Sequence, residues 1–302
     1  MAKRAQPKPA VLPLPGGRPG ATVGLHPLVS GRGAVPPAFL HRDQGRLASL
    51  KALGLGARRD DWVRIPFVSF LVEHPGAGPL LVDTGLHPSI GLDPALNLGR
   101  LYGWIMRDAL TSPEESVTAQ LLDRGLDPRE IAAVVMTHLH FDHTSAMTEL
   151  PEAAFLVDEL EWEAATAPLA LLHGYVRRHL SPGLDVRLLD FDAAEVDSFA
   201  TFGRSLDLFG DGSVRLVATP GHTDGHLSVI LRLRDREALL CGDAAYTMRT
   251  LERSEMPGRT EDDHLFRRSL REIQRYLEQT PGTLVVPGHD MERWEVLDRV
   301  YE

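Results

Sequence analysis

The stretch VVMTHLHFDH, residues 134–143, places three imidazoles and a carboxylate within six residues, directly after an apolar run. The run from Ala132 to Met136 is typical of a buried strand, so the polar residues are expected on the loop where that strand ends. Neutral imidazole is the commonest nitrogen ligand for zinc and related metals, and a carboxylate beside it is more typical of a catalytic site than of a closed structural one. The candidate ligands in this stretch are His138, His140, Asp142 and His143.

Three later segments repeat the pattern of an apolar strand that ends in a metal-binding residue type. VRLVATPGH ends at His222, ALLCGD ends at Asp243, and TLVVPGH ends at His289. The chain has 13 histidines, and an isolated histidine is usually a half-buried surface residue. Histidines clustered as densely as those in residues 138–143 repel one another once protonated unless they share a ligand, so the pattern predicts a metal site.

The composition predicts a chain that folds around one large core. It has 302 residues, of which 43% are hydrophobic, enough to bury a core without disulfides. Residues 1–20 carry basic but no acidic side chains among many prolines and glycines, so we expect a flexible tail there and a single domain over residues 21–302. The only cysteine, Cys241, and the lack of a signal-like apolar segment in the first thirty residues favour a cytoplasmic location.

The charge and hydropathy of the chain exclude two classes of partner. Thirty-two basic against 42 acidic residues give a net charge of −10, which disfavours nucleic acid as a partner because its phosphates would be repelled. No run of about 18 apolar residues occurs, so we expect no membrane span. A small, neutral and partly apolar substrate suits this charge.

The order of predicted elements indicates sheets covered by helices. Residues 67–74 and 79–83 flank a Pro-Gly-Ala-Gly turn and predict a hairpin. Ser112 followed by Pro-Glu-Glu predicts the cap of a helix that ends at Gly125, and a second helix is expected from about Thr260 to Leu277. Strand, helix, strand units follow the early hairpin, which favours layered sheets with helices outside them.

The complete ligand pattern, HxHxDH, then TPGH, GD and PGH, resembles the metallo-β-lactamase superfamily. The resemblance runs from about Val23 to the C-terminus. It implies an αββα sandwich, in which two mixed sheets pack face to face with helices outside. It also implies two divalent metal ions with seven protein ligands. One ion is held by His138, His140 and His222, the other by Asp142, His143 and His289, and Asp243 bridges the two.

Within that superfamily, the sequence Asp-Ala-Ala-Tyr at residues 243–246 resembles the DxxY arrangement of the N-acyl homoserine lactonases. The stretches SFLVEHP, residues 69–75, and LVDTG, residues 81–85, are similar to that family as well. The resemblance implies a hydrolase that opens the ester ring of lactones, N-acyl homoserine lactones above all, by attack of a metal-bridging hydroxide. Tyr246 would then face the substrate carbonyl, and we expect Asp142 to pass a proton to the leaving alkoxide. The plainer interpretation of Tyr246 is an amphipathic residue at a pocket rim.

One departure from the family pattern lies beside the cluster. Members commonly follow HxHxDH with a small residue and two glycines, whereas Thr144, Ser145 and Ala146 stand here. These residues remove no ligand, but they change the loop that carries them and so bear on the substrate. Zinc is the expected metal, and histidine with aspartate also accepts iron, manganese and cobalt. A homodimer is expected from the resemblance. Residues 96–110 could line an acyl-chain pocket, form a subunit contact or pack on the core.

Two other functions fit the same ligands. A glyoxalase II type thioesterase shares the dinuclear site, but Tyr246 and the lack of a basic cluster to hold glutathione carboxylates argue against it; promiscuous ester or phosphotriester hydrolysis is the further alternative. A noncatalytic metal protein would need only four ligands around one ion. The residues expected to orient the ligands without binding metal are Asp83, Thr137, Thr219, Thr223 and His226. Cys241 is expected to be a buried, neutral thiol.

Overall fold

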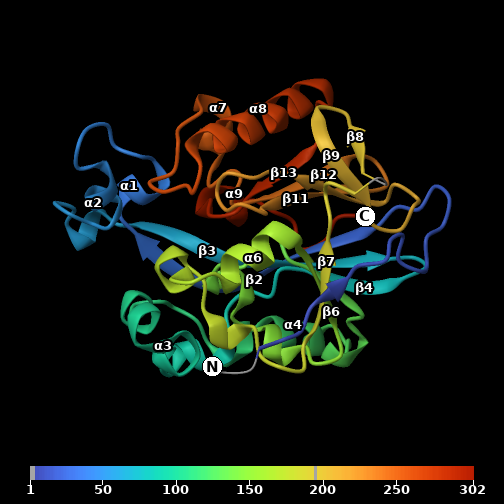
Figure 1. Ribbon diagram of the computed structural model, residues 1–302, viewed down its shortest axis with the longest axis horizontal. Helices are drawn as coiled ribbons and strands as arrows, with labels where there is room; N and C mark the ends of the chain where they lie inside the picture. The colour runs from blue at the N-terminus through green and yellow to red at the C-terminus, as the bar shows by residue number, and fades with distance from the viewer. Residues whose placement is uncertain (1–3, 194–195) are drawn as a thin grey trace.

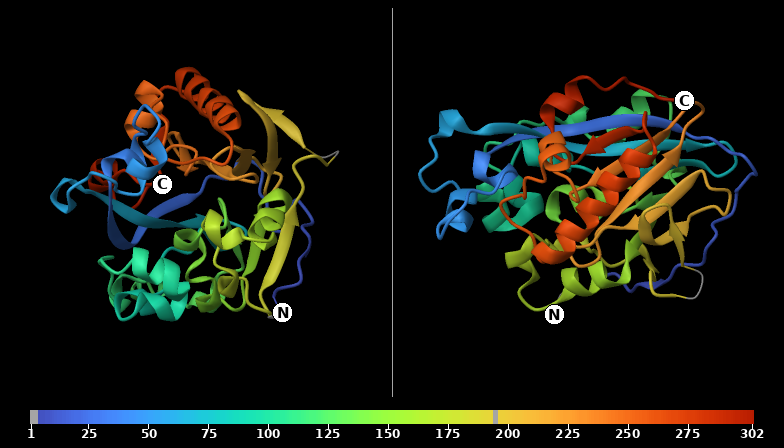
Figure 2. Two further views of the ribbon diagram at one scale, coloured as in Figure 1. Left: turned by 60° about the vertical axis from the view of Figure 1, so that its left-hand side comes forward. Right: turned by 90° about the horizontal axis from the view of Figure 1, so that it is seen from above.

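Two β-sheets lie face to face at the centre of the molecule, and helices cover the outer face of each (Figure 1). The structure is a computed structural model that describes residues 4–193 and 196–302. Helices α3, α4 and α6 lie over the outer face of the first sheet, and α7 and α8 lie over the second (Figures 1 and 2). Both sheets contain parallel and antiparallel pairs, so the expected αββα sandwich with two mixed sheets is confirmed.

The two sheets take their strands from successive parts of the chain. The first sheet has the spatial order β1(Lys8–Pro9), β7(Asp185–Leu189), β6(Ala154–Asp158), β5(Ala133–Val135), β4(Gly78–Val82), β3(Val63–His74), β2(Gly24–Val35). The second has the order β13(Leu284–Pro287), β12(Glu237–Gly242), β11(Leu227–Arg232), β10(Val214–Ala218), β9(Phe202–Asp207), β8(Asp197–Phe199).

Helices connect and flank these strands. The α-helices are α1(Pro37–Leu40), α2(Ala48–Ala52), α3(Pro94–Ile105), α4(Val117–Asp123), α5(Phe141–Thr144), α6(Glu159–Thr166), α7(Met248–Arg253), α8(Asp263–Gln279) and α9(Met291–Glu295). Short 3-10 turns include η3(Pro113–Glu115) and η7(Arg177–His179). Within the described ranges, no helix is both long and apolar enough to cross a membrane.

The strands are buried on both faces because each sheet lies between its partner sheet and a helical layer. Successive side chains of a strand point to opposite faces. In β3, Val72 packs in the core between the sheets, whereas Leu71 packs beneath the helices of the first layer. In β11, Val229 and Ile230 divide in the same way between the central core and the layer under α8. This explains why the sequence shows continuous apolar runs in place of alternation.

The predicted hairpin and the predicted buried strand are confirmed, and one predicted helix start is corrected. β3 and β4 pair antiparallel around the Pro-Gly-Ala-Gly turn, and β5 covers the centre of the expected strand. Ser112 caps the short turn η3, and the α-helix begins one turn later with Ser116 as its cap. The Ser-Pro-Glu-Glu sequence forms the 3-10 turn η3, and the chain changes direction at Ser116 before α4 begins. The second helix is confirmed as α8, capped by Asp262.

The expected flexible tail is wrong for residues 4–20; residues 1–3 of that prediction lie outside the described residues. Strand β1 pairs parallel with β7, and Ala5 is buried. The backbone N–H of Leu14 then donates to the carbonyl of Leu208, which directly follows β9 of the second sheet. The composition argument failed because this segment needs no core of its own. It satisfies its backbone groups on the free edge of β7, beside which it runs in Figure 2.

A buried hydrogen bond between His74 and Asp211 ties this N-terminal segment to both sheets. His74 Nε2, at the end of β3, lies 3.0 Å from Asp211 Oδ2 in the turn between β9 and β10. The same carboxylate accepts hydrogen bonds from the backbone N–H groups of Arg18 and Ser213. Burial by itself raises the pKa of Asp211, but the hydrogen bonds from Ser213, Arg18 and His74 outweigh it and lower the pKa to about 2. Three segments distant in sequence therefore meet at one carboxylate.

We predict that Asp211→Asn lowers the free energy of unfolding at pH 7, by roughly 1–3 kcal/mol, because the N–H donors lose a charged acceptor. A carboxyl whose pKa is depressed in the folded state stabilises the fold above its unfolded pKa of about 4 and loses that effect as the pH falls toward 2. The difference between variant and wild type should therefore shrink from pH 5 to pH 2 in urea denaturation. A difference that is constant over this range would contradict the prediction.

Candidate metal centre

Four strand ends meet at one edge of the sandwich. β10 and β12 both run antiparallel to β11, and β13 runs parallel to β12, so the carboxyl ends of β10, β12 and β13 share one edge of the second sheet. The loop that follows β5 in the first sheet reaches the same edge, where the backbone N–H of Leu227 donates to the carbonyl of Thr137. Each of these four ends carries one or more of the predicted ligands.

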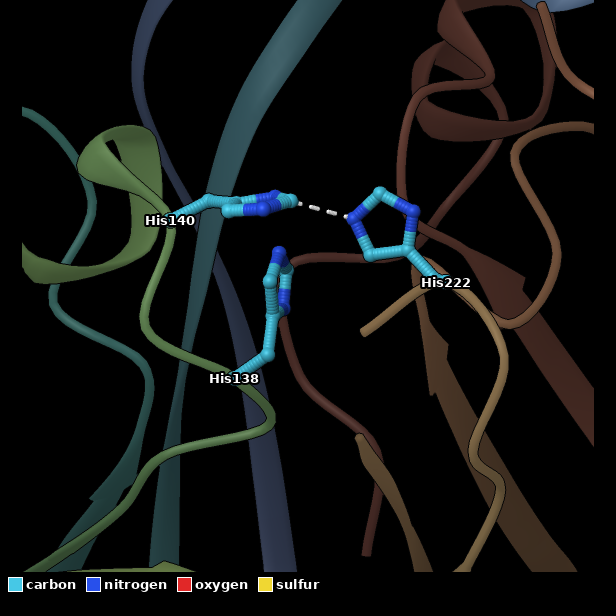
Figure 3. Close-up of side chains that lie close together, drawn as sticks. All are labelled: His138, His140 and His222. Carbon is cyan, nitrogen blue, oxygen red and sulfur yellow. Dashed lines mark hydrogen bonds between the residues drawn. The ribbon is translucent and has the colours of Figure 1, made fainter. Parts of the chain in front are cut away.

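The first group comprises His138, His140 and His222, which point toward one another (Figure 3). One nitrogen from each ring lies within 4.8 Å of the others. His222 Nε2 is 3.0 Å from His140 Nδ1, and the rings of His138 and His222 stand nearly perpendicular. Two loops from different sheets therefore bring three imidazoles to one point.

The second group comprises Asp142, His143 and His289, and Asp243 lies between the two groups. His143 Nε2 and His289 Nε2 are each 3.7 Å from Asp142 Oδ2. Asp243 Oδ2 is 3.3 Å from His222 Nε2 and 3.2 Å from His289 Nε2, and so faces both groups. All seven residues expected as ligands therefore lie together, in two sets with Asp243 between them, which is the arrangement that the resemblance implies.

Hydrogen bonds on the far side of the rings fix which nitrogen faces the site. His143 Nδ1 lies 2.8 Å from Asp83 Oδ2, and His289 Nδ1 faces the carbonyl of Pro66 at 3.3 Å. Because an oxygen on the far side accepts the proton of Nδ1, Nε2 is the nitrogen that each ring directs toward the cluster. Asp83 also accepts from the N–H and hydroxyl of Thr137. The orienting roles expected for Asp83 and Thr137 agree with these contacts.

The donor set of the cluster fits two divalent cations. His138 Nε2 and Asp243 Oδ1 are buried and have no hydrogen-bond partner among the residues that the structure describes. Burying such atoms without a partner is costly, and both point into the cluster, where a cation would satisfy them. Imidazole nitrogens and carboxylate oxygens suit several transition metals, so the donor set fits a dinuclear site without choosing one metal.

The imidazoles of the first group are neutral. Burial, with the neighbouring imidazoles adding to it, holds the pKa of His138 well below its ordinary value. Burial also lowers the pKa of His140 to about 4 and that of His222 well below its ordinary value, although nearby carboxylates oppose this. A ring that stays unprotonated keeps a lone pair available for a metal.

His226 lies behind the cluster and contacts the backbone of Asp243. Its Nε2 accepts the N–H of Asp243 at 2.9 Å, and its Nδ1 lies 2.9 Å from the hydroxyl of Thr219. Both nitrogens of its ring therefore have hydrogen-bond partners, which agrees with the orienting role expected for His226. The thiol of Cys241, on the same strand, is fully buried, and burial raises its pKa to about 12, so the expected neutral thiol is confirmed.

Tyr246 is buried beside the first group. Only 3% of its surface is exposed, its hydroxyl lies 3.4 Å from His222 Nδ1, and the ring of Phe39 packs against it at 5.6 Å. The plainer interpretation, an amphipathic residue at a pocket rim, now applies to a side chain that is buried and whose hydroxyl faces His222. Burial raises the pKa of Tyr246 well above its ordinary value, so the hydroxyl keeps its proton. A protonated hydroxyl at the cluster is a hydrogen-bond donor.

The departure at residues 144 and 145 builds a polar network that joins the ligand loop to α3. The hydroxyl of Thr144 lies 2.8 Å from His179 Nδ1, and His179 Nε2 lies 2.9 Å from Asn97 Oδ1. Ser145 donates to the same amide oxygen and accepts the N–H of His87. Burial lowers the pKa of His179 to about 3, so its ring is neutral. The Thr144 hydroxyl also lies 3.0 Å from the carbonyl of His140, so it connects that carbonyl to the ring of His179, whose Nε2 faces Asn97 Oδ1.

Residues 96–110 divide between core and surface. Tyr102 is buried, stacks on Phe141 at 4.6 Å and donates its hydroxyl to Leu171. On the same helix, Leu96 and Trp104 are about two-thirds exposed. Packing on the core therefore explains the side of α3 that carries Tyr102. An acyl-chain pocket or a subunit contact could involve only the other residues of this segment.

Sequence reasoning missed a buried carboxylate, Glu161, in the first turn of α6. Its oxygens accept the backbone N–H groups of Leu139, at 2.8 Å, and of Gly225, at 3.2 Å. Burial raises the pKa of Glu161 to about 7, although these N–H groups oppose the rise. The local pattern Asp-Glu-Leu-Glu, residues 158–161, has the form of a capping box, and that interpretation gives no reason to look for a distant partner.

The fold and the cluster are those of a known superfamily. The family model described as Metallo-beta-lactamase superfamily matches residues 66–289, and the chain belongs to that superfamily. Its relatives include N-acyl homoserine lactonase AttM of Azorhizobium caulinodans, 34% identical over 236 residues, which are 76% of this chain and 84% of that protein. AttM of Agrobacterium fabrum is 33% identical over 235 residues, with the same shares. The resemblance is confirmed, and the chain is a metal-dependent hydrolase.

Solved structures share the fold. The crystal structure of a quorum-quenching N-acyl homoserine lactone lactonase aligns over 92% of this chain and 96% of its own, with a TM-score of 0.69 and 21% identity. An N-acyl homoserine lactone hydrolase with the product N-hexanoyl-L-homoserine bound at its catalytic metal centre aligns over 92% and 97%, with a TM-score of 0.70 and 23% identity.

We predict that Asn97→Ala lowers the free energy of unfolding by about 1–3 kcal/mol, because it leaves His179 Nε2–H and the Ser145 hydroxyl without their acceptor. The control is Leu96→Ala on the same helix, whose exposed side chain should change stability by no more than about 0.5 kcal/mol. Urea denaturation of the two variants gives the comparison. Equal effects would show that the network contributes nothing to stability.

Proposed function

We propose that this chain is an N-acyl homoserine lactonase that uses two divalent metal ions. The observation that carries the proposal is the Tyr246 hydroxyl lying beside a cluster of seven histidine and aspartate ligands. The relatives named AttM, at 33–34% identity over three quarters of the chain, support the same substrate class.

The proposed ligands of one ion are His138, His140 and His222, those of the other are Asp142, His143 and His289, and Asp243 contacts both. When bound, two such ions supply Lewis-acid activation of a water molecule and of the substrate carbonyl. We propose zinc for both positions, since histidine-rich sites with carboxylates accept it readily. A single hydrolase domain, a cytoplasmic location and a homodimer stay predictions of the sequence and of the resemblance.

Two side chains of the cluster are proposed to act on the lactone directly. Tyr246, which keeps its proton, is proposed to donate a hydrogen bond to the carbonyl oxygen as negative charge develops on it. Asp142 directs Oδ2 toward His143 and His289, and its side chain is 12% exposed. Its second carboxylate oxygen can take a proton from the attacking water and pass it to the ring oxygen as that oxygen leaves.

We predict that the zinc-loaded protein opens the ring of a medium-chain N-acyl homoserine lactone, measured as proton release in weak buffer, and that a chelator abolishes the reaction. Metal content is determined on the same sample. Absence of turnover with two zinc ions bound would reject the lactonase proposal. A thioester and a phosphotriester are then tested with the same preparation, because the ligand set serves those esters as well.

We predict that Tyr246→Phe lowers kcat for the lactone by roughly 10²-fold, with a smaller effect on KM, because one donor to the developing oxyanion is lost. The matched control is Tyr276→Phe, a buried tyrosine on α8 whose hydroxyl bonds to Glu237 away from the cluster. That variant should keep the wild-type kcat. If Tyr246→Phe also keeps it, the tyrosine is only a packing residue.

A further inference from the structure

Glu161 is a carboxylate enclosed by the protein with no basic partner. It is 1% exposed, and the groups that act on its pKa are hydrogen-bond donors, with no Lys or Arg among those described. Burying a charged or polar group is costly unless hydrogen bonds replace its water. Its two oxygens are satisfied by backbone N–H groups from two separate loops, those of Leu139 and Gly225.

Both of these loops carry proposed metal ligands. Leu139 stands between His138 and His140, and Gly225 follows His222 by three residues. All three histidines belong to the first group, although one loop follows β5 and the other follows β10. Glu161 is therefore a bridge between the two backbones from which that group is built.

The position of the bridge is fixed by the start of α6. Asp158 caps the helix by accepting the N–H groups of Leu160 and Glu161. Gly225 lies so close to this turn that a Cβ atom there would collide with the backbone N of Glu161 and lie 2.5 Å from Asp158 Oδ1. The second loop thus sits directly on the helix start, and the close approach requires glycine.

We propose that Glu161 is a positioning residue, whose carboxylate holds the Leu139 and Gly225 backbones so that His138, His140 and His222 converge on one metal ion. The inference rests on the ligand set of the proposed function and assigns a further residue to it. A carboxylate suits this role because both of its oxygens accept. A glutamine keeps the size of the side chain but has a single acceptor oxygen. Its NH2 group would therefore face one of the two backbone N–H groups, and that hydrogen bond would be lost.

The test measures zinc binding to metal-free Glu161→Gln by competition with a chelator. We expect roughly 10- to 100-fold weaker binding of one of the two zinc equivalents, the range found when residues behind metal ligands are changed, and a smaller effect on the other. Lactone turnover should fall with the zinc occupancy and recover as zinc is raised. The amide protons of Leu139 and Gly225 should exchange faster in the variant. The matched control is Glu163→Gln, the same change on an exposed position of α6, which should bind zinc as the wild type does.

Each outcome decides between positioning and plain stability. If Glu161→Gln binds both zinc equivalents with wild-type affinity, the inference is overturned even where its metal-free form unfolds more easily. If that variant does not fold, Glu161→Asp is used instead, because it keeps the charge but moves the oxygens away from the two backbone N–H groups. Weaker binding of one zinc equivalent would then support the inference, and wild-type binding of both would overturn it. If the wild-type protein itself fails to bind two zinc ions or to open the lactone, the proposed function fails, which is a distinct result.

Discussion

The confinement of five imidazoles and two carboxylates to one small volume is the constraint on which the rest of this structure depends. Water is largely excluded there, so each ring needs a partner on its far side to stay in place. Asp83 holds His143, the carbonyl of Pro66 faces His289, and the Tyr246 hydroxyl lies beside His222. Without such partners the rings would rotate or take up water, and the lone pairs would no longer meet.

The sandwich meets this constraint by bringing strand ends of both sheets to one edge. The segments that follow these ends are held in place by hydrogen bonds from neighbouring elements. The anchors act on the backbone as well as on side chains: His226 accepts the N–H of Asp243, and Glu161 accepts those of Leu139 and Gly225. Ligand geometry here is consequently determined in part by residues that never face a ligand ring.

The ligands and the strands that carry them could be predicted because both signals are local. An apolar run followed by His or Asp is visible in ten residues, and four such runs defined the cluster. The other contacts could not be predicted, because their partners are distant in sequence. The sequence around Glu161 has the form of a capping box, which is a local pattern, and nothing near Asn97 points to His179. Ser112 was correctly identified as a cap, but of the turn before the helix.

The N-terminal segment has a consequence for how the molecule meets other chains. Along a strand, successive N–H groups point to opposite sides, and the N–H of Ala10 points toward β7. The outward positions on either side of Lys8 are Pro7 and Pro9, which have no N–H to offer. An open sheet edge is a template on which another chain can add a strand and begin an aggregate. Here the outward donors of β1 are replaced by proline, so this edge of the sheet presents few groups with which a further strand could pair.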